Sequence, residues 1–208
     1  MGRSPRHPGR FLVLEGCDGA GKSTHAGLLR DRLQALGREV LLLREPGGTE
    51  VGERVRAILL DPALKGMDVR TELCLFMACR AQLVATVIEP ALQRGAVVVC
   101  DRFLYSTIVY QGIAGGLPEE DIRAVARVAV GGLEPDRIVV LDVPVAETMT
   151  RTGGGRDRME LKGEAFLRRV REGYLQLASG DPTAVVVDAT QPREIVARHV
   201  WEHVREDV

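Results

Sequence analysis

A glycine-rich stretch near the start of the chain, EGCDGAGKST at residues 15–24, has the residue types of a phosphate-binding loop. Its spacing fits G-x-x-x-x-G-K-[ST], with Gly16, Gly21, Lys22 and Ser23 at the defining positions. Glycine lets successive backbone N–H groups point at one anion, the lysine reaches the β- and γ-phosphates, and the serine hydroxyl ligates Mg²⁺. The spacing therefore predicts a nucleotide held by the whole loop: Gly16, Cys17, Asp18, Gly19, Ala20, Gly21, Lys22, Ser23 and Thr24. A glycine turn that binds nothing is the alternative.

A second pair of charged residues, Asp101 and Arg102, follows the apolar run AVVVC. A carboxylate at the tip of a buried strand beside the phosphate-loop strand is the usual second support for Mg²⁺, so the metal is expected at Ser23 and Asp101. An aspartate that caps the next helix is the alternative. Arginine in this position can form two parallel hydrogen bonds with an anion, whereas a lone surface arginine is the plainer interpretation of Arg102.

Five apolar runs predict the strands that position these residues: 11–15, 40–43, 96–100, 137–143 and 184–187. They lack polar alternation, as strands covered on both faces do, and helical patterns separate them. This order predicts an α/β fold, a doubly wound and mainly parallel five-stranded sheet that carries the P-loop, with helices on both faces and a small lid. Ligands of such sheets lie beyond the carboxyl ends of the strands, where REPGGTE at 44–50 and TGGGRDR at 152–158 also belong.

The composition limits the possible functions. The 208 residues suffice for a single domain, predicted over 11–208 with a lid around 150–162, behind a basic and disordered tail at 1–10. A net charge of −1 gives no bulk attraction to nucleic acid or to a membrane, and no apolar run has membrane-spanning length. The four cysteines form no C-x-x-C pair and are interpreted as reduced thiols of a cytoplasmic protein. Cys17 is either reactive or buried and inert.

Several motifs, in order, resemble those of the thymidylate kinase family from Phe11 to the end of the chain: EGCDGAGKST, REPGGT, LFMACRAQLV, DRFLYSTIVYQG, DRME and DAT. The resemblance implies an enzyme that transfers the γ-phosphoryl group of ATP to dTMP, giving dTDP and ADP, with Mg²⁺ as cofactor. Because the acceptor is already a phosphate, no strong general base is required. Catalysis then depends on positioning and on neutralising negative charge.

The resemblance also implies roles for the matching residues. Asp18 approaches the deoxyribose 3′-hydroxyl, and Pro46 packs near the nucleotide. Phe76 stacks on thymine, and Arg80, on the same helix face four residues later, hydrogen-bonds the base edge. Without the resemblance, Phe76 is interpreted as a core residue. Arg102 grips the dTMP phosphate. Three further residues lie at the base and the sugar: Thr107, Tyr110 and Gln111.

Gly19 stands where some members of the family, including eukaryotic ones, carry an arginine in the phosphate loop. The bacterial pattern places the arginine in the lid instead, and this lid has Arg151, Arg156 and Arg158. We expect one of them to meet the ATP phosphates. Arg156 is favoured, then Arg151, because Arg158 can hold the lid to the acceptor side. The alternative is three solvated loop charges.

A helix over residues 72–92 would be apolar on more than one face and so needs more than one partner surface. The resemblance implies a two-fold homodimer through this region, and complete burial within one subunit is the alternative.

Three rival functions were weighed. A deoxynucleoside kinase would need a carboxylate base and no arginine for an acceptor phosphate, so Arg102 argues against it. A nucleotide-dependent switch protein would carry N-K-x-D, which this sequence lacks. A purely structural domain is disfavoured because Lys22, Ser23 and Asp101 are all present.

Overall fold

The computed structural model describes residues 7–151, 158–159 and 162–208. One sheet of five parallel strands has the order β2-β3-β1-β4-β5. The strands are β1 (Arg10–Glu15), β2 (Val40–Arg44), β3 (Val97–Asp101), β4 (Arg137–Asp142) and β5 (Ala184–Asp188). The predicted sheet is confirmed, and every strand boundary lies within one residue of its expected position.

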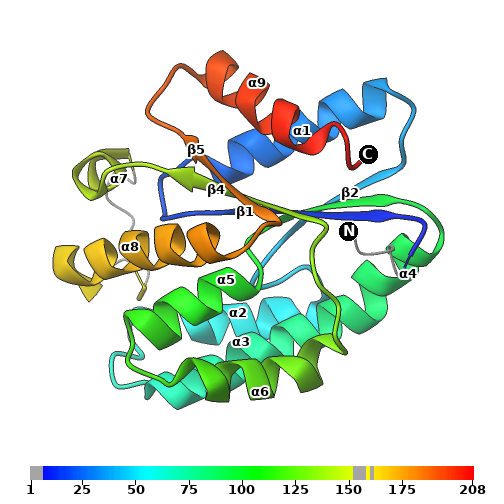
Figure 1. The fold of residues 1–208 in the computed structure, drawn as a ribbon. Coiled ribbons are helices and arrows are strands. Elements are labelled where there is room, and N and C mark those ends of the chain that lie inside the picture. Colours follow the sequence, from blue (N-terminus) through cyan, green and yellow to red (C-terminus); the bar gives the residue numbers. More distant parts are fainter. Residues whose placement is uncertain (1–6, 152–157, 160–161) are drawn as a thin grey trace.

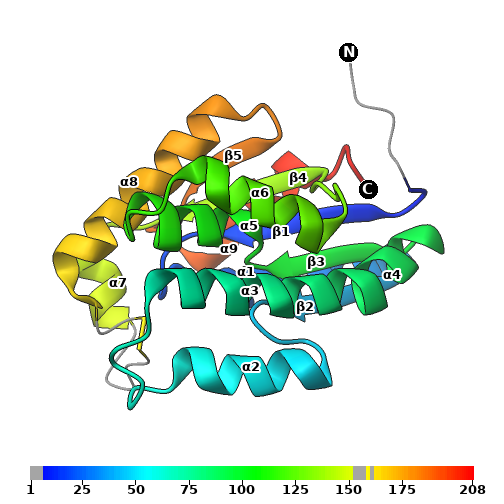
Figure 2. The same cartoon turned by 90° about the horizontal axis from the view of Figure 1, so that it is seen from below.

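Helices cover both faces of this sheet (Figure 1). On one face lie α1 (Lys22–Ala35) and α9 (Arg193–Val204). Figure 2 shows the helices on the other side, namely α2 (Glu50–Leu60), α3 (Val69–Leu83), α5 (Leu104–Thr107), α6 (Glu119–Val130) and α8 (Glu164–Gly180). Alternate residues of each strand enter two separate cores, so that Leu12 packs toward α1 and Val13 toward α8. Burial on both faces explains why the strands read as continuous apolar runs.

The amino-terminal tail is shorter than predicted. The Gly9 N–H donates to the Leu92 carbonyl at 3.0 Å, and the Arg10 N–H donates to the Ala96 carbonyl at 3.2 Å. Arg10 also pairs in register with Val97 of β3. Because this backbone pairing extends β1 toward the amino terminus, the expectation of disorder is wrong at Gly9 and Arg10.

A continuous helical run from Val69 to Gln93 contains the apolar segment 72–92. It consists of α3, the π-helical η1 (Val84–Ile88) and α4 (Glu89–Gln93). By length and composition this run meets the criterion for a membrane-spanning helix, so the expectation that no apolar segment reaches that length is wrong. The finding is weak evidence for a membrane, because 44% of the most apolar window is buried and core helices of soluble proteins meet the same criterion.

Candidate active site

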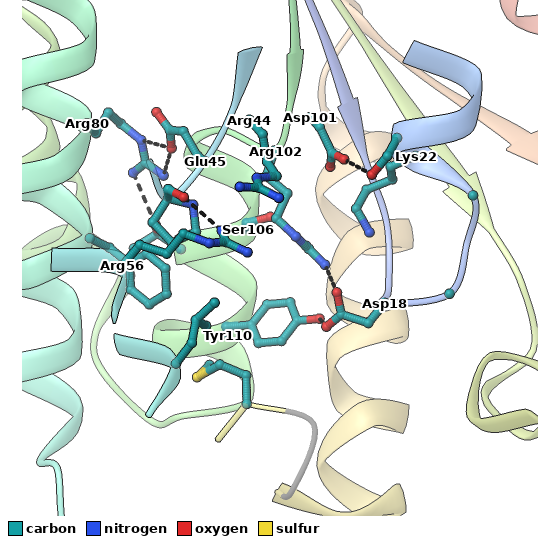
Figure 3. A pocket seen from close by; sticks show the side chains of 18 of the residues that line it. Asp18, Lys22, Arg44, Glu45, Arg56, Arg80, Asp101, Arg102, Ser106 and Tyr110 are labelled. Carbon is teal, nitrogen blue, oxygen red and sulfur yellow. Dashed lines mark hydrogen bonds and ion pairs between the residues drawn. The ribbon is translucent and has the colours of Figure 1, made fainter. Parts of the chain in front are cut away.

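A cavity of about 460 Å³ opens at the carboxyl edge of the sheet. The phosphate loop forms one side, and the ends of β2 and β3, helices α2, α3 and α5 and the π-helical η2 (Ile108–Ile113) form the others. Figure 3 shows Lys22 and Asp101 on one side, Arg80 and Glu45 on the other, and Arg102 between them. Parallel strands bring these residues together because Arg44, Asp101 and Leu14 share one register position at the carboxyl ends of three neighbouring strands.

The phosphate loop has the backbone that its glycines permit. Gly16, Gly19 and Gly21 have φ values of 136°, 78° and 89°, which favour glycine. A Cβ atom on Gly16 would lie 2.5 Å from the Leu141 carbonyl oxygen, so a side chain is excluded there. The Lys22 Nζ donates to the Cys17 carbonyl at 2.8 Å, which folds the lysine across the loop. Burial and the nearby Arg102 lower the pKa of Lys22.

Ser23 and Asp101 form the pair expected to hold Mg²⁺. The Ser23 Oγ donates to the Asp101 Oδ2 at 2.5 Å, and Asp101 is buried at the end of β3. A hydroxyl and one carboxylate fit Mg²⁺, which usually takes one or two protein oxygens and leaves its other positions to water and substrate phosphates. No cluster of three or more His, Cys, Asp or Glu residues occurs in the described part of the chain, so no competing metal centre is found there.

Arg102 and Asp18 form a direct ion pair at the wall of the cavity. The Arg102 Nη2 donates to the Asp18 Oδ1 at 2.5 Å, and the Tyr110 hydroxyl donates to Oδ2 at 3.2 Å. Burial alone would raise the pKa of Asp18, but Arg102 and Lys22 outweigh it and hold that pKa well below its usual range. The pKa of Arg102 is raised instead. Burial alone would lower it, but the negative charge of Asp18 outweighs that effect. Both groups are therefore charged at neutral pH.

Arg80 enters the cavity from α3 with its guanidinium fixed. The Arg80 Nη2 lies 2.6 Å from the Glu45 Oε2 and donates to the Phe103 carbonyl at 2.9 Å, while Nη1 donates to the Thr107 Oγ1 at 3.1 Å. Only 1% of Arg80 is exposed. Phe76 is half-buried one turn earlier and lines the same cavity.

Glu72 of α3 is a buried carboxylate that connects its helix to η2 and to Arg158 and Lys162. Its carboxylate lies 2.5 Å from the Arg158 Nη1 and 3.0 Å from the Lys162 Nζ, and it accepts from the Gln111 Nε2 at 3.0 Å. The Arg158 Nε also donates to the Leu59 carbonyl at 2.9 Å. Arg158 is thus buried between α3 and the end of α2. Burial would raise the pKa of Glu72, but these hydrogen bonds and cations lower it.

Replacing Glu72 by alanine is expected to reduce the free energy of unfolding by about 3–5 kcal/mol, because Arg158 would remain buried without its partner. Urea unfolding measures this change. Glu164→Ala is the matched control, since it removes an exposed ion pair with Arg168 and should cost below about 1 kcal/mol.

The difference between wild type and Glu72→Ala should also depend on pH. Because folding lowers the pKa of Glu72, its contribution is fully present above the unfolded pKa of about 4.3 and is lost as the pH falls through the folded value. Equal losses for the Glu72 and Glu164 variants at neutral pH would contradict the role of this buried carboxylate.

Arg151, at the end of α7 (Val145–Arg151), lies between the phosphate loop and the turn after β5. Its Nη1 donates to the Gly19 carbonyl at 3.5 Å and to the Ala189 carbonyl at 3.3 Å, and Nη2 pairs with Glu147. Arg151 therefore borders the cavity on the phosphate-loop side. Arg156 lies outside the described residues.

The predicted site residues divide into two groups. Those that line the cavity are Asp18, Gly19, Gly21, Lys22, Ser23, Thr24, Pro46, Phe76, Arg80, Asp101, Arg102, Thr107, Tyr110, Gln111 and Arg151. Three predicted loop residues do not line it: Gly16, Cys17 and Ala20. All three are buried, so the loop turns these positions toward the core.

Six lining residues were missed by the sequence analysis: Arg44, Glu45, Arg56, Leu60, Ser106 and Met159. Arg44 and Glu45 begin the REPGGT motif, which was expected at the carboxyl edge of the sheet, but neither was singled out as a site residue. Arg56 reaches the cavity from α2, where its Nη1 donates to the Pro46 carbonyl at 2.8 Å. Met159 belongs to the DRME motif of the family resemblance, but no role at the cavity was expected for it.

Cys17 is expected to resist alkylation in the native protein. Burial raises its pKa to about 11, so only about one thiol in a thousand is ionised at pH 8. Mass spectrometry after brief iodoacetamide treatment should find Cys17 unmodified, whereas the same treatment in urea should modify it. Complete modification of native Cys17 within minutes would show that the thiol is reactive. The structure favours the buried alternative, with 3% of the residue exposed.

A loop that binds phosphates faces an arginine that can grip a second anion, and this arrangement defines a P-loop phosphotransferase with a small anionic acceptor. The fold agrees, because both groups lie beyond the carboxyl ends of a parallel sheet. The chain belongs to the thymidylate kinase family, whose model matches residues 14–200. Members of this family phosphorylate dTMP to dTDP with ATP.

Individual relatives agree with the family match. The chain is 46% identical over 198 residues to the thymidylate kinase of Symbiobacterium thermophilum, covering 94% of this chain and 92% of that one. It is 50% identical over 187 residues to the thymidylate kinase of Pseudomonas fluorescens, covering 88% and 89%. The crystal structure of thymidylate kinase from Ehrlichia chaffeensis is similar with a TM-score of 0.78 and 30% identity, covering 93% of this chain and 97% of that one. The predicted α/β kinase fold is confirmed.

Proposed function

We propose that the two sides of the cavity divide the reaction between them, with ATP on the phosphate loop and dTMP on the side of α3 and α5. The observation that carries this assignment is the place of Arg102. It stands opposite Lys22, and its guanidinium is directed into the cavity toward Asp18. An acceptor with a phosphate group requires such a cation, whereas an uncharged sugar hydroxyl does not. The deoxynucleoside kinase alternative is disfavoured on this ground.

On the acceptor side, Phe76 stacks on thymine and Arg80 hydrogen-bonds the base edge, as the family resemblance implies. Both residues line the cavity one turn apart on α3. The Arg80 guanidinium donates a hydrogen bond to Thr107, so the residues proposed to contact the base are connected to one another. Tyr110 packs under the sugar and Asp18 approaches the 3′-hydroxyl; the hydrogen bond from the Tyr110 hydroxyl to Asp18 supports a common role for the two residues. Pro46 and Gln111 close the same side.

The reaction itself needs positive charge rather than a base. Two anions, the acceptor phosphate and the γ-phosphoryl group of ATP, must approach, and charge spreads over the equatorial oxygens in the transition state. Lys22 and Arg102 supply this charge from the two sides. When bound at Ser23 and Asp101, Mg²⁺ neutralises charge on the β- and γ-phosphates. Some members of the family have a further cation, an arginine, at the loop position of Gly19. In this chain Arg151 or Arg156 supplies that cation.

A panel of acceptors tests this function by coupled release of ADP. We expect dTMP to be preferred over dUMP by about 1–3 kcal/mol in kcat/KM, the usual discrimination for one methyl group in a shaped apolar pocket. Thymidine, which lacks the phosphate that Arg102 is proposed to grip, should be a poor acceptor. If dCMP or a deoxynucleoside proves the best acceptor, the assignment is wrong.

We further propose that the enzyme acts as a cytoplasmic homodimer through the helical run of residues 72–92. Four free cysteines accord with a reducing compartment. The outer face of this run carries small exposed residues, including Cys74, Ala78 and Ala85, which allow another helix to approach closely. Apolar residues of the neighbouring α2 and α6 are also exposed: Val51 by 49%, Ile58 by 45%, Val125 by 36% and Val128 by 86%. An isologous contact would cover this surface.

Light scattering at micromolar concentration is expected to give about twice the 22.7 kDa mass of one chain. Ala78→Arg places a charge on the exposed face and should yield a folded monomer, because a charge without a partner in an apolar interface is unfavourable. Arg70→Ala, at an exposed position near the start of α3, is the control and should leave the mass unchanged. A monomeric wild type would contradict the proposed dimer.

A further inference from the structure

Glu15 is a buried carboxylate that the proposed mechanism does not use. It is the last residue of β1, directly before the first glycine of the phosphate loop, and 0% of it is exposed. Burial raises its pKa, and Arg102 opposes this shift. A carboxyl group removed from water in this way is retained only where it forms good hydrogen bonds.

Within the described part of the chain, the Glu15 carboxylate accepts its hydrogen bonds from residues 103 and 106, beside the cavity, and from α8. The Oε1 atom accepts from the backbone N–H groups of Phe103 at 2.8 Å and Ser106 at 3.2 Å. The Oε2 atom accepts from the Ser106 Oγ at 2.6 Å and from the Tyr174 hydroxyl at 3.2 Å. Phe103 occupies the N-cap position of α5 but has no polar side-chain atom. The carboxylate of Glu15, at the end of β1, caps this helix instead.

Arg102 has a strained backbone conformation directly before this capped helix. Its φ of 76° is the only positive φ of a non-glycine residue within the described part of the chain. Such a conformation is unfavourable for a residue with a side chain and persists only where the surrounding structure fixes it. The hydrogen bond from the Phe103 N–H to Glu15 fixes the peptide that follows Arg102. The Arg102 N–H donates to the Leu14 carbonyl at 2.9 Å and so fixes the residue itself.

Glu15 also directs the two hydroxyl groups that orient the Arg102 guanidinium. The Arg102 Nη1 donates to the Ser106 Oγ at 2.9 Å, the Tyr174 hydroxyl at 3.0 Å and the Gly16 carbonyl at 3.1 Å. A hydroxyl group has one proton and two lone pairs. The two hydroxyls also lie 2.8 Å apart, and either can donate to the other. A hydroxyl that donates its proton to Glu15 keeps its lone pairs for Arg102, and the Ser106 Oγ is the nearer of the two to the carboxylate.

We propose that Glu15 is a positioning residue that holds Arg102 in the geometry required to grip the acceptor phosphate. The carboxylate acts on the arginine twice, through the backbone of the turn and through the two hydroxyl groups. This inference rests on the proposed function, in which Arg102 binds the phosphate of dTMP. It links the strand that carries the phosphate loop directly to the acceptor side of the cavity.

The test compares the affinities of dTMP and thymidine, measured by calorimetry, for wild type and Glu15→Gln. The two ligands differ by the phosphate group alone. Glu15→Gln keeps the shape of the side chain but replaces one acceptor oxygen with a donor. We expect it to weaken dTMP binding by tenfold or more and thymidine binding by less than threefold, so that the ratio of the two affinities falls. A general loss of stability would not change this ratio.

Tyr105→Phe is the matched control. Its hydroxyl also joins α5 to a half-buried carboxylate, Asp181, at 2.7 Å, but it is not among the hydrogen-bond partners of the Arg102 guanidinium in the described part of the chain. This variant should keep the wild-type ratio. Tyr174→Phe removes one hydroxyl between Glu15 and Arg102 and should lower the ratio at least threefold. It decides the question if Glu15→Gln does not fold.

The remaining outcomes overturn the proposal in distinguishable ways. If wild type prefers dTMP but the tested variants weaken both ligands equally, or change neither, then Glu15 does not position Arg102. If wild type binds dTMP no more tightly than thymidine, the phosphate role of Arg102 is wrong, and the role of Glu15 is wrong with it.

Discussion

Replacing Arg102 with alanine is expected to lower kcat/KM for dTMP by about 10²–10³-fold, which is the usual loss when one charged contact to the reacting group is removed. Two effects contribute. The acceptor phosphate loses its cation, and Asp18 remains at 2.5 Å from the former guanidinium position as a carboxylate without its partner. Arg102 is also the main group that offsets the burial of Asp18, so its loss leaves that carboxylate without its principal cation beside an anionic acceptor.

Two further variants separate these effects. Arg102→Lys keeps a charge but not the planar fork of donors, so it should recover only part of the activity. Asp18→Asn combined with Arg102→Ala removes the uncompensated carboxylate and should recover thermal stability more than activity. Should Arg102→Ala keep kcat/KM within threefold of wild type, Arg102 does not bind the acceptor phosphate.

A single arginine beside the phosphate loop is expected to account for a large part of the rate. Comparable arginines contribute about 10³–10⁵-fold to kcat in other phosphoryl-transfer systems. Arg151 is one candidate, because it borders the cavity and contacts the Gly19 carbonyl. Arg156 was favoured from the sequence and lies outside the described residues. Alanine variants of each should identify which one reduces kcat far more than the affinity for ATP.

Arg158 is not a useful member of that set, because it is buried against Glu72 and its loss should reduce stability first. Arg168→Ala is the control for a solvated arginine, since its partner Glu164 is also exposed. If Arg151→Ala, Arg156→Ala and the double variant all keep kcat within about threefold, the arginine on the phosphate-loop side supplies no catalytic charge.

The sequence predicted most features that depend on short segments. The spacing of Gly16, Gly21 and Lys22 determines the loop, and continuous apolar runs determine strands buried on both faces. In a parallel sheet the carboxyl ends of all strands lie at one edge. The predicted strand order therefore indicated that Asp101 lies near Ser23 at that edge. These features are local, or they follow from general rules of parallel topology.

Features that depend on contacts between distant segments could not be predicted in the same way. Glu72 and Arg158 are 86 positions apart, and Glu15 and Tyr174 are 159 apart. The position of a charged residue in an apolar helix, such as Glu72, does not indicate which distant residue will pair with it. Arg158 was placed on the acceptor side only as one possibility among three lid arginines. Tertiary packing, rather than local sequence, selects which of several arginines is buried with which carboxylate.

The fixed guanidinium of Arg80 has a thermodynamic consequence for the base recognition that we propose for this residue. An arginine side chain that becomes ordered loses about 2 kcal/mol of rotamer entropy. In this protein Glu45, Thr107 and Phe103 restrain Arg80 before any nucleotide arrives, so that entropy is lost during folding and not during binding. Association with the acceptor should therefore show a small entropic penalty on this side of the cavity. Glu45→Gln, by returning motion to Arg80, should make the binding entropy of dTMP less favourable while the enthalpy of its base contacts changes little.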